Sequence, residues 1–207
     1  KSKYGINVLP LAFDIRNNND VKNAISSLPD EWIKIEILIN NAGLAVGLNT
    51  IHEGEIDDWE RMIDTNVKGL LYISRAVLPL FVKNKKGHVI NIGSIAGKEV
   101  YPFGNVYCAT KHAVDAITKA MRTELVKDGV KVTQIAPGAI ETEFSIVRFK
   151  GDKEKAAGIY KGFKPLEPED IADIVYYTTT LPSHVNINDL IVMPTAQASS
   201  TVFDKKA

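Results

Sequence analysis

The sequence is poor in cysteine, with Cys108 as the only one among 207 residues. A single cysteine excludes a disulfide within the chain and thiolate metal clusters, and it is typical of an intracellular protein. We interpret Cys108 as a small apolar filler rather than a nucleophile. The histidines lack the spacing to acids or to one another that metal sites show; they are His52, His88, His112 and His184. The sequence therefore predicts no metal.

An excess of charge of one sign is also lacking, because 25 Lys and Arg are balanced by 25 Asp and Glu. A neutral chain has no overall field that recruits nucleic acid or an anionic membrane. No apolar run approaches the roughly 18 residues of a membrane span, and residues 1–4 lack the apolar core of a signal peptide. We expect a soluble, cytoplasmic protein with small-molecule partners.

Apolar, strand-like runs alternate with longer stretches of helical periodicity along the whole chain. The predicted strands are 6–13, 35–40, 88–92, 130–136 and 187–193, and the predicted helices are 20–28, 56–63, 66–83, 105–126 and 168–180. Uninterrupted apolar strands separated by helices are typical of a parallel sheet that is covered on both faces. The sequence predicts one α/β domain over residues 1–207.

Tyr107 and Lys111 lie one helical turn apart, so they share a face of the predicted helix 105–126. An ammonium about 4 Å from a phenol interacts with the phenolate by roughly 4 kcal/mol at a dielectric of about 20. That attraction would lower the phenol pKa from about 10 toward roughly 7, which suits a general acid or base. Ser94, after strand 88–92, would then hold a substrate oxygen. Taken alone, the pair also fits an amphipathic surface stripe.

Three other motifs accompany this group. Asn41-Ala42-Gly43 follows an apolar strand, Asp64-Thr65-Asn66-Val67 opens an apolar helix, and Ile135-Ala136-Pro137-Gly138 closes another strand. With Ser94 and the Tyr–Lys pair, they resemble the short-chain dehydrogenase/reductase family over essentially the whole chain. Runs 141–149 and 181–188 look like its branch of NADP-dependent serine and 3-hydroxy acid dehydrogenases.

The resemblance implies a doubly wound, Rossmann-like sheet and a catalytic group of Asn66, Ser94, Tyr107 and Lys111. Tyr107 would move the proton, Lys111 would stabilise the phenolate and bind ribose, and Asn66 would hold a water of a proton relay. From the residues alone, Asn66 also fits a helix N-cap, Ser94 a turn former and Lys111 a solvated side chain.

The resemblance also implies an NADP site. Its residues would be Asp14, Asn41, Ala42, Gly43, Tyr107, Lys111, Pro137, Gly138, Ile140 and Thr142. Asp14 would contact the adenine end, whereas Ile140 and Thr142 would meet the nicotinamide carboxamide. Asp14 also fits a turn or helix-entry acid, and Asn41 with Gly43 fits an ordinary turn.

No glycine-rich phosphate loop occurs in the sequence. The doubly wound fold places such a loop after its first strand. If residues 6–13 form the third strand of that fold, two βα units, about 50 residues, precede it. We therefore expect the domain to lack its N-terminal βαβα portion and, as written, to bind a dinucleotide poorly.

Arg148 is the candidate for a substrate carboxylate, because a guanidinium matches a carboxylate in two-pronged fashion; a solvated arginine is the alternative. The glycine-containing, charged segment 143–164 suits a mobile substrate lid or a plain surface loop-helix. The tail from Thr195 is too polar to bury itself. In the resembling branch the C-terminus reaches a neighbouring subunit, so a homotetramer is expected.

These observations predict an oxidoreductase that transfers a hydride between NADP, or less favourably NAD, and the 3-hydroxyl of a small hydroxy acid or serine-like substrate. One alternative is reduction of another small ketone. A second is nucleotide-sugar epimerisation or dehydration, although the chain ends soon after Met193. A third is a non-catalytic family member that acts as an oligomer scaffold.

Overall fold

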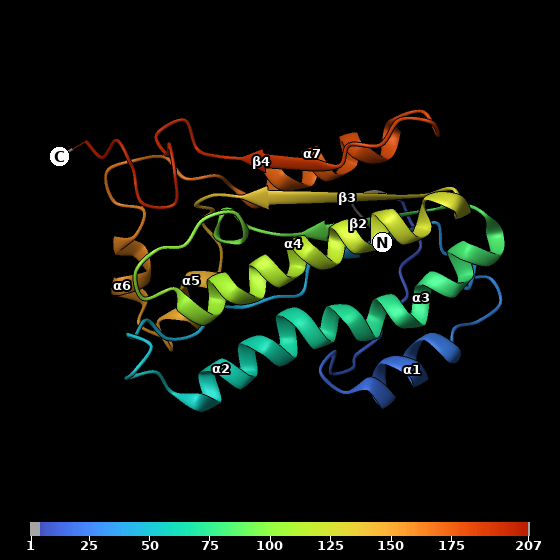
Figure 1. Cartoon of the computed structure of the whole chain (residues 1–207), viewed down its shortest axis with the longest axis horizontal. Coiled ribbons are helices and arrows are strands. Elements are labelled where there is room, and N and C mark those ends of the chain that lie inside the picture. Colours follow the sequence, from blue (N-terminus) through green and yellow to red (C-terminus); the bar gives the residue numbers. More distant parts are fainter. Residues whose placement is uncertain (1–4, 207) are drawn as a thin grey trace.

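A four-stranded parallel sheet forms the centre of the computed structural model, which describes residues 5–206 (Figure 1). Its strands, in spatial order, are β1 (Ile37–Asn40), β2 (Gly87–Ile92), β3 (Val130–Pro137) and β4 (Asp189–Val192). All neighbouring strands pair in parallel. The predicted parallel α/β fold is confirmed.

Seven α-helices connect and cover the strands of residues 5–206. They are α1 (Asn18–Ser26), α2 (Ile56–Ile63), α3 (Leu70–Asn84), α4 (Asn105–Leu125), α5 (Phe144–Arg148), α6 (Lys153–Gly158) and α7 (Pro168–Thr180). A π-helical turn, Asp64–Gly69, joins α2 to α3. The predicted bounds of α2 and α7 agree with the structure. In α7 the N-terminus is set by Pro168 and by a capping box between Glu167 and Asp170.

Helices lie on both faces of the sheet. In Figure 1, α4 crosses in front of the labelled strands, and α1 packs against α3. Val89 and Val132 pack in the core shared with these helices, whereas Ile90 and Ile135 pack against Ile171 of α7. Because side chains alternate between the faces of a strand, the two cores lie on opposite sides of the sheet. The doubly wound arrangement is confirmed.

Residues 6–13, which were predicted to form a strand, do not. The segment joins no ladder among residues 5–206, and the side chains of Ile6 and Val8 are each 57% exposed. A strand requires a neighbour for its backbone N–H and C=O groups. Apolar runs therefore form strands in this chain where a neighbouring strand is available to pair with them, and residues 6–13 have none among the described residues.

The tail prediction was also wrong in part. The side chain of Gln197 is only 6% exposed, and its Oε1 accepts a 2.7 Å hydrogen bond from the Ala139 amide. Farther along, the rings of Phe203 and Phe163 lie 5.2 Å apart. A polar side chain is buried here because the same chain satisfies it. The tetramer stays a prediction.

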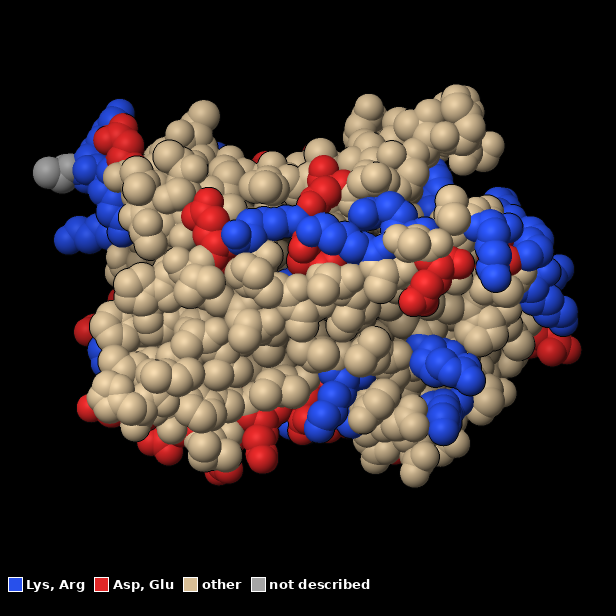
Figure 2. All heavy atoms as spheres, viewed as in Figure 1, with Lys and Arg blue, Asp and Glu red and all other residues tan. Residues whose placement is uncertain are grey.

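Basic and acidic side chains lie side by side in a band across the face shown in Figure 2. This mixture accords with the zero formal net charge. Across residues 5–206, no helix combines the length and hydropathy that a bilayer crossing requires.

Candidate active site

The carboxyl ends of the strands meet at one edge of the sheet, and most of the predicted site residues gather there. A Cβ atom added to Gly43, after β1, would lie 3.3 Å from Oδ1 of Asn66 and 3.5 Å from Nζ of Lys111. Lys111 in turn donates a 3.0 Å hydrogen bond to the carbonyl of Ile92, the last residue of β2. The open edge of a parallel α/β sheet is where such folds bind ligands.

Lys111 is buried, with 7% of its surface exposed. Loss of water disfavours the ammonium, and burial lowers the pKa of Lys111 to about 8. An amine of this acidity exchanges a proton near neutral pH. Its position on α4 is the predicted one.

Tyr107 is buried one helical turn earlier, and its ring centroid lies 5.5 Å from that of Phe144. Burial raises the pKa of the phenol, with Tyr101 adding to the rise, whereas Ser94 and Arg148 act to lower the pKa. The predicted net lowering by Lys111 was wrong. The desolvation of the phenolate is the larger effect, and the Lys111 amine donates to the Ile92 carbonyl instead.

Ser94 follows β2 in extended conformation. Its Oγ accepts a 3.1 Å hydrogen bond from the Ala96 amide, which is the turn-forming role. The same hydroxyl is close enough to Tyr107 to lower the phenol pKa. The structure therefore brings the serine and the tyrosine together while the serine also stabilises its turn.

Asn66 lies in the π-helical turn and is 2% exposed. Its amide accepts from the Leu44 N–H and donates to the Leu44 carbonyl, both at 2.8 Å, and it donates to Thr110 Oγ1 at 3.0 Å. The N-cap interpretation was wrong, because α2 runs directly into this turn. Such turns are frequent at functional sites.

A network of buried polar side chains lies next to the carboxyl edge of the sheet. Asn40, at the end of β1, donates to Asn91 Oδ1 at 2.8 Å and to Ser74 Oγ at 3.3 Å. Asn91 donates to Thr118 Oγ1 of α4 at 2.9 Å. Satisfied buried amides hold β1, β2, α3 and α4 in one arrangement.

An open groove of about 520 Å³ lies beside the same edge. Its lining includes the predicted cofactor residues Asp14 and Ala42, together with the cations Arg16 and Arg61. Asp14 accepts hydrogen bonds from Arg16, the shortest at 2.6 Å, and these hold the pKa of the carboxyl at about 2. Asn41, Ala42 and Gly43 are exposed, so their backbone is accessible from solvent.

The segment after β3 is closely held. The Gly138 amide follows Pro137 and donates to the Val192 carbonyl at 2.8 Å. The Ile140 carbonyl accepts from the Tyr160 hydroxyl at 2.7 Å, and Thr142 Oγ1 accepts from the Phe144 amide at 3.2 Å. The Thr142 hydroxyl thus has a local structural bond in addition to its predicted cofactor contact.

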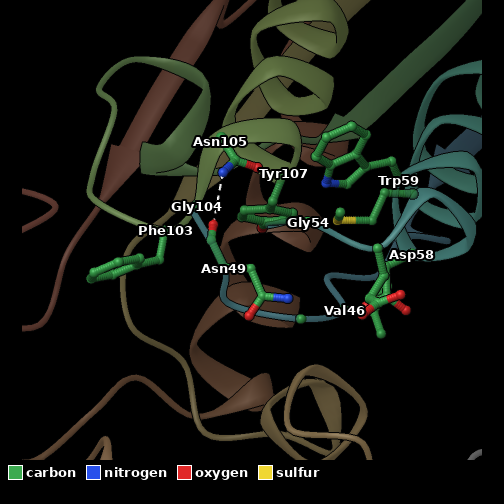
Figure 3. Close-up of a pocket in the computed structure, with 12 residues that line it drawn as sticks. Val46, Asn49, Gly54, Asp58, Trp59, Phe103, Gly104, Asn105 and Tyr107 are labelled. Carbon is green, nitrogen blue, oxygen red and sulfur yellow. Dashed lines mark hydrogen bonds between the residues drawn. The ribbon is translucent and has the colours of Figure 1, made fainter. Parts of the chain in front are cut away.

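Phe144 and Arg148 of α5 pack against Tyr107. On another side of the tyrosine is a cavity of about 10 Å³, the size of roughly one water. Figure 3 shows the Tyr107 ring at this cavity, with Trp59 and Asp58 from α2 and with Asn105, which donates to the Asn49 carbonyl at 2.9 Å. Phe144 and Arg148, near the start of segment 143–164, thus lie against the ring of Tyr107.

Arg148 lies at the site, rather than in solvent. Its Nη2 donates a 2.8 Å hydrogen bond to Oη of Tyr101, a residue that the sequence interpretation missed. The interpretation also missed Thr110, the hydroxyl partner of Asn66. Thr110 shares α4 with Tyr107 and could have been found by helical spacing, but Tyr101 lies in a loop where no periodicity identifies it.

Comparisons with known proteins agree with this geometry. A family model described as short chain dehydrogenase matches residues 1–153. The NADP-dependent 3-hydroxy acid dehydrogenase YdfG of Salmonella typhi is 50% identical over 199 residues, which cover 96% of this chain and 80% of that protein. The NADP-dependent 3-hydroxy acid dehydrogenase of Schizosaccharomyces pombe is 45% identical over 208 residues, or 100% and 80% of the two chains.

Solved structures give the same result. The closed form of a serine dehydrogenase complexed with NADP+ superposes with a TM-score of 0.89 at 48% identity, covering 94% of this chain and 79% of the other. Serine dehydrogenase from Escherichia coli gives a TM-score of 0.78 at 44% identity, covering 90% and 76%. The resemblance predicted from the motifs, and the oxidoreductase class that it implies, are confirmed.

Proposed function

Because the chain belongs to the short-chain dehydrogenase family, we propose that it transfers a hydride between NADP and the 3-hydroxyl of a small hydroxy acid or serine-like substrate. Residues 1–207 belong to a single catalytic domain in this proposal. The observation that carries it is that Tyr107 lies beside Ser94 and the guanidinium of Arg148, while Lys111, one helical turn along α4, bonds the end of β2 at the carboxyl edge of the sheet. The similar dehydrogenases that act with NADP support it.

The residues present fit NADP. The exposed turn Asn41 to Gly43 reaches Asn66 and Lys111, since a Cβ atom at Gly43 would lie 3.3 Å from the Asn66 amide oxygen and in ordinary contact with the Lys111 amine. The groove beside it carries Arg16 and Arg61, cations that suit an anionic dinucleotide. NADP, when bound, accepts the hydride from the alcohol carbon. Asp14, Pro137, Gly138, Ile140 and Thr142 complete the proposed cofactor site.

The chain's own residues manage the proton. In the oxidation direction, the substrate O–H bond breaks as the hydride leaves its carbon, and Tyr107 takes the proton while Ser94 hydrogen-bonds the same oxygen. In the reduction direction the Tyr107 hydroxyl returns that proton. Since burial raises the Tyr107 pKa and lowers that of Lys111 to about 8, the protonated phenol is the resting form, which can donate its proton directly in the reduction direction. For oxidation the phenol first has to pass its proton to solvent through the Lys111 amine beside Asn66, and the resulting phenolate then takes the substrate proton.

Arg148 binds the substrate carboxylate in this proposal. A hydroxy acid whose carboxylate meets the guanidinium can present its hydroxyl to the adjacent Tyr107 and Ser94. The close cover from α5 favours a small substrate.

The test is the Tyr107→Phe variant of the full-length protein, assayed with NADP and a panel of short hydroxy acids and serine. Loss of the proton-transfer group should lower kcat by roughly 10²- to 10⁴-fold. Binding of NADPH, measured by fluorescence titration, should be retained because the ring and its packing remain. Undiminished turnover would reject the role of Tyr107, and wild-type inactivity with every hydroxy acid would reject the substrate class.

A further inference from the structure

A guanidinium is stacked between two tyrosines beside the proposed acid–base. Cζ of Arg148 lies 5.3 Å from the ring centroid of Tyr101 and 5.6 Å from that of Tyr107. Both distances fall within the range of cation–π attraction, about 6 Å. With the 2.8 Å hydrogen bond to the Tyr101 hydroxyl, these contacts restrain the arginine near the phenol of Tyr107.

This cation has no acidic partner among the ion pairs of residues 5–206. Asp58, the acid of α2 that lines the cavity beside Tyr107, pairs instead with Lys150 at 2.8 Å. The Nε of Arg148 is buried and has no hydrogen-bond partner. A guanidinium has five N–H donors, so most of them remain for an anion that approaches in its plane.

Tyr101 is itself held in place by its loop. A Cβ atom added to Gly104 would lie 2.2 Å from Cε2 of Tyr101, so the ring occupies space that any other residue at 104 would take. The Gly104 amide also donates to the Tyr101 carbonyl at 3.2 Å. The phenol stays neutral, because burial raises the pKa of Tyr101. A neutral, fixed hydroxyl orients the guanidinium without neutralising it.

We propose that Tyr101 is a specificity-determining residue, which positions Arg148 so that the enzyme selects substrates with a carboxylate over neutral alcohols. The proposal rests on the function given above and adds to it the residue that sets charge selectivity. Tyr101 acts through Arg148 and is a positioning residue.

The experiment compares Tyr101→Phe with wild type in the full-length protein, with 3-hydroxybutanoate and its methyl ester as probes. Phenylalanine keeps the ring but removes the oxygen that holds Nη2. Since a hydrogen bond to a charged group contributes about 1.5–3 kcal/mol, the KM for the acid should rise by roughly 10-fold or more. The KM for the ester should change by less than about twofold, and any change in kcat should be the same for acid and ester, because it would come from the effect of Tyr101 on the Tyr107 pKa.

Tyr176→Phe is the matched control, because Tyr176 lies on α7 and is 71% exposed. Arg148→Lys is the second variant and keeps the charge while losing the fork that Tyr101 orients. In the double variant, the Tyr101→Phe change should no longer raise the KM for the acid.

Equal rises in KM for the acid and the ester would overturn the proposal, because they indicate a general distortion of the site. An unchanged KM for the acid would overturn it as well. Either result leaves the hydride-transfer function intact, since that function depends on Tyr107; an inactive wild type, by contrast, would remove the function and this inference together.

Discussion

The two ends of strand β2 each bury a basic nitrogen, and the two groups have opposite consequences. At the carboxyl end, Lys111 donates to the carbonyl of Ile92, and burial lowers its pKa to about 8. At the amino end, His88 is 5% exposed, its Nε2 lies 2.8 Å from Thr133 Oγ1, and burial, with Lys131 adding to it, lowers its pKa to about 4.

At pH 7 the imidazole of His88 is neutral, so no charge has to leave water when it is buried. The amine of Lys111 is still largely protonated at that pH, so folding has to desolvate an ammonium. The comparison teaches that the site edge carries a desolvation cost at pH 7 that His88, at the other end of β2, does not. The apolar cluster beside the site, which includes Met62, Ala96 and Cys108, offsets that cost through packing.

The largest expected effect on turnover comes from Lys111→Met, which removes the buried charge. Turnover of the full-length protein should fall by about 100-fold or more, because the variant loses the amine that relays the Tyr107 proton to solvent in the proposed mechanism. Stability without NADP should rise instead, since a pKa lowered from 10.5 to about 8 corresponds to about 3 kcal/mol of desolvation at pH 7.

Thermal unfolding at pH 7 and at about pH 10.5 checks this result. The advantage of the variant should shrink as the pH rises through 8 toward 10.5, because the wild-type unfolded state then also loses its proton. A variant that is less stable than wild type at pH 7 would contradict the comparison.

A change at the amino end of β2 should lower stability while leaving turnover nearly unchanged. Phe81 is fully buried and packs against Gly87, so Phe81→Ala should lower the free energy of unfolding by about 3–5 kcal/mol. The KM and kcat of the remaining folded protein should stay near wild type. Urea unfolding and active-site-normalised kinetics measure both, with Val126→Ala, at a site 72% exposed, as the control.

At neutral pH the smallest effect comes from His88, whose contribution to stability changes only as the pH falls. Its folded pKa of about 4 lies below the ordinary value of 6.5, so the unfolded chain takes up the proton first as the pH falls. The free energy of unfolding is unaffected by His88 above about pH 6.5. It falls as the pH drops from about 6.5 to about 4, by at most about 3 kcal/mol.

His88→Gln should remove this part of the pH dependence, whereas His52→Gln, at an exposed loop position, should retain it. The free energy of unfolding, measured by urea at several pH values between 4 and 7, distinguishes the two variants. Parallel curves for wild type and His88→Gln would show that the imidazole does not titrate between the folded and unfolded states.

Patterns confined to one segment predicted much of the fold. The apolar strands at 88–92 and 130–136 and the helices at 56–63 and 168–180 were recognised, because periodicity and caps are encoded within each segment. Residues 6–13 look equally apolar but form no strand, since pairing depends on a neighbour that lies elsewhere in the chain.

Parts of the site were less predictable for a similar reason. The order of Asn66, Ser94, Tyr107 and Lys111 was readable as a family pattern, but the direction of the Tyr107 pKa was not. That direction follows from burial by Phe144 and neighbouring groups, which approach from another helix. Tyr101 was not recognised because its importance depends on the position of Arg148, 47 residues away.

The sequence by itself determined the alternation of strands and helices and the kinds of chemical group that reach the carboxyl edge of the sheet. Only the tertiary structure decided which strands pair, which cation stands beside the phenol and which proton each buried group holds. The physical reason is that hydrogen-bond pairing and desolvation depend on atoms brought together from distant segments, whereas propensity and periodicity depend on neighbours along the chain.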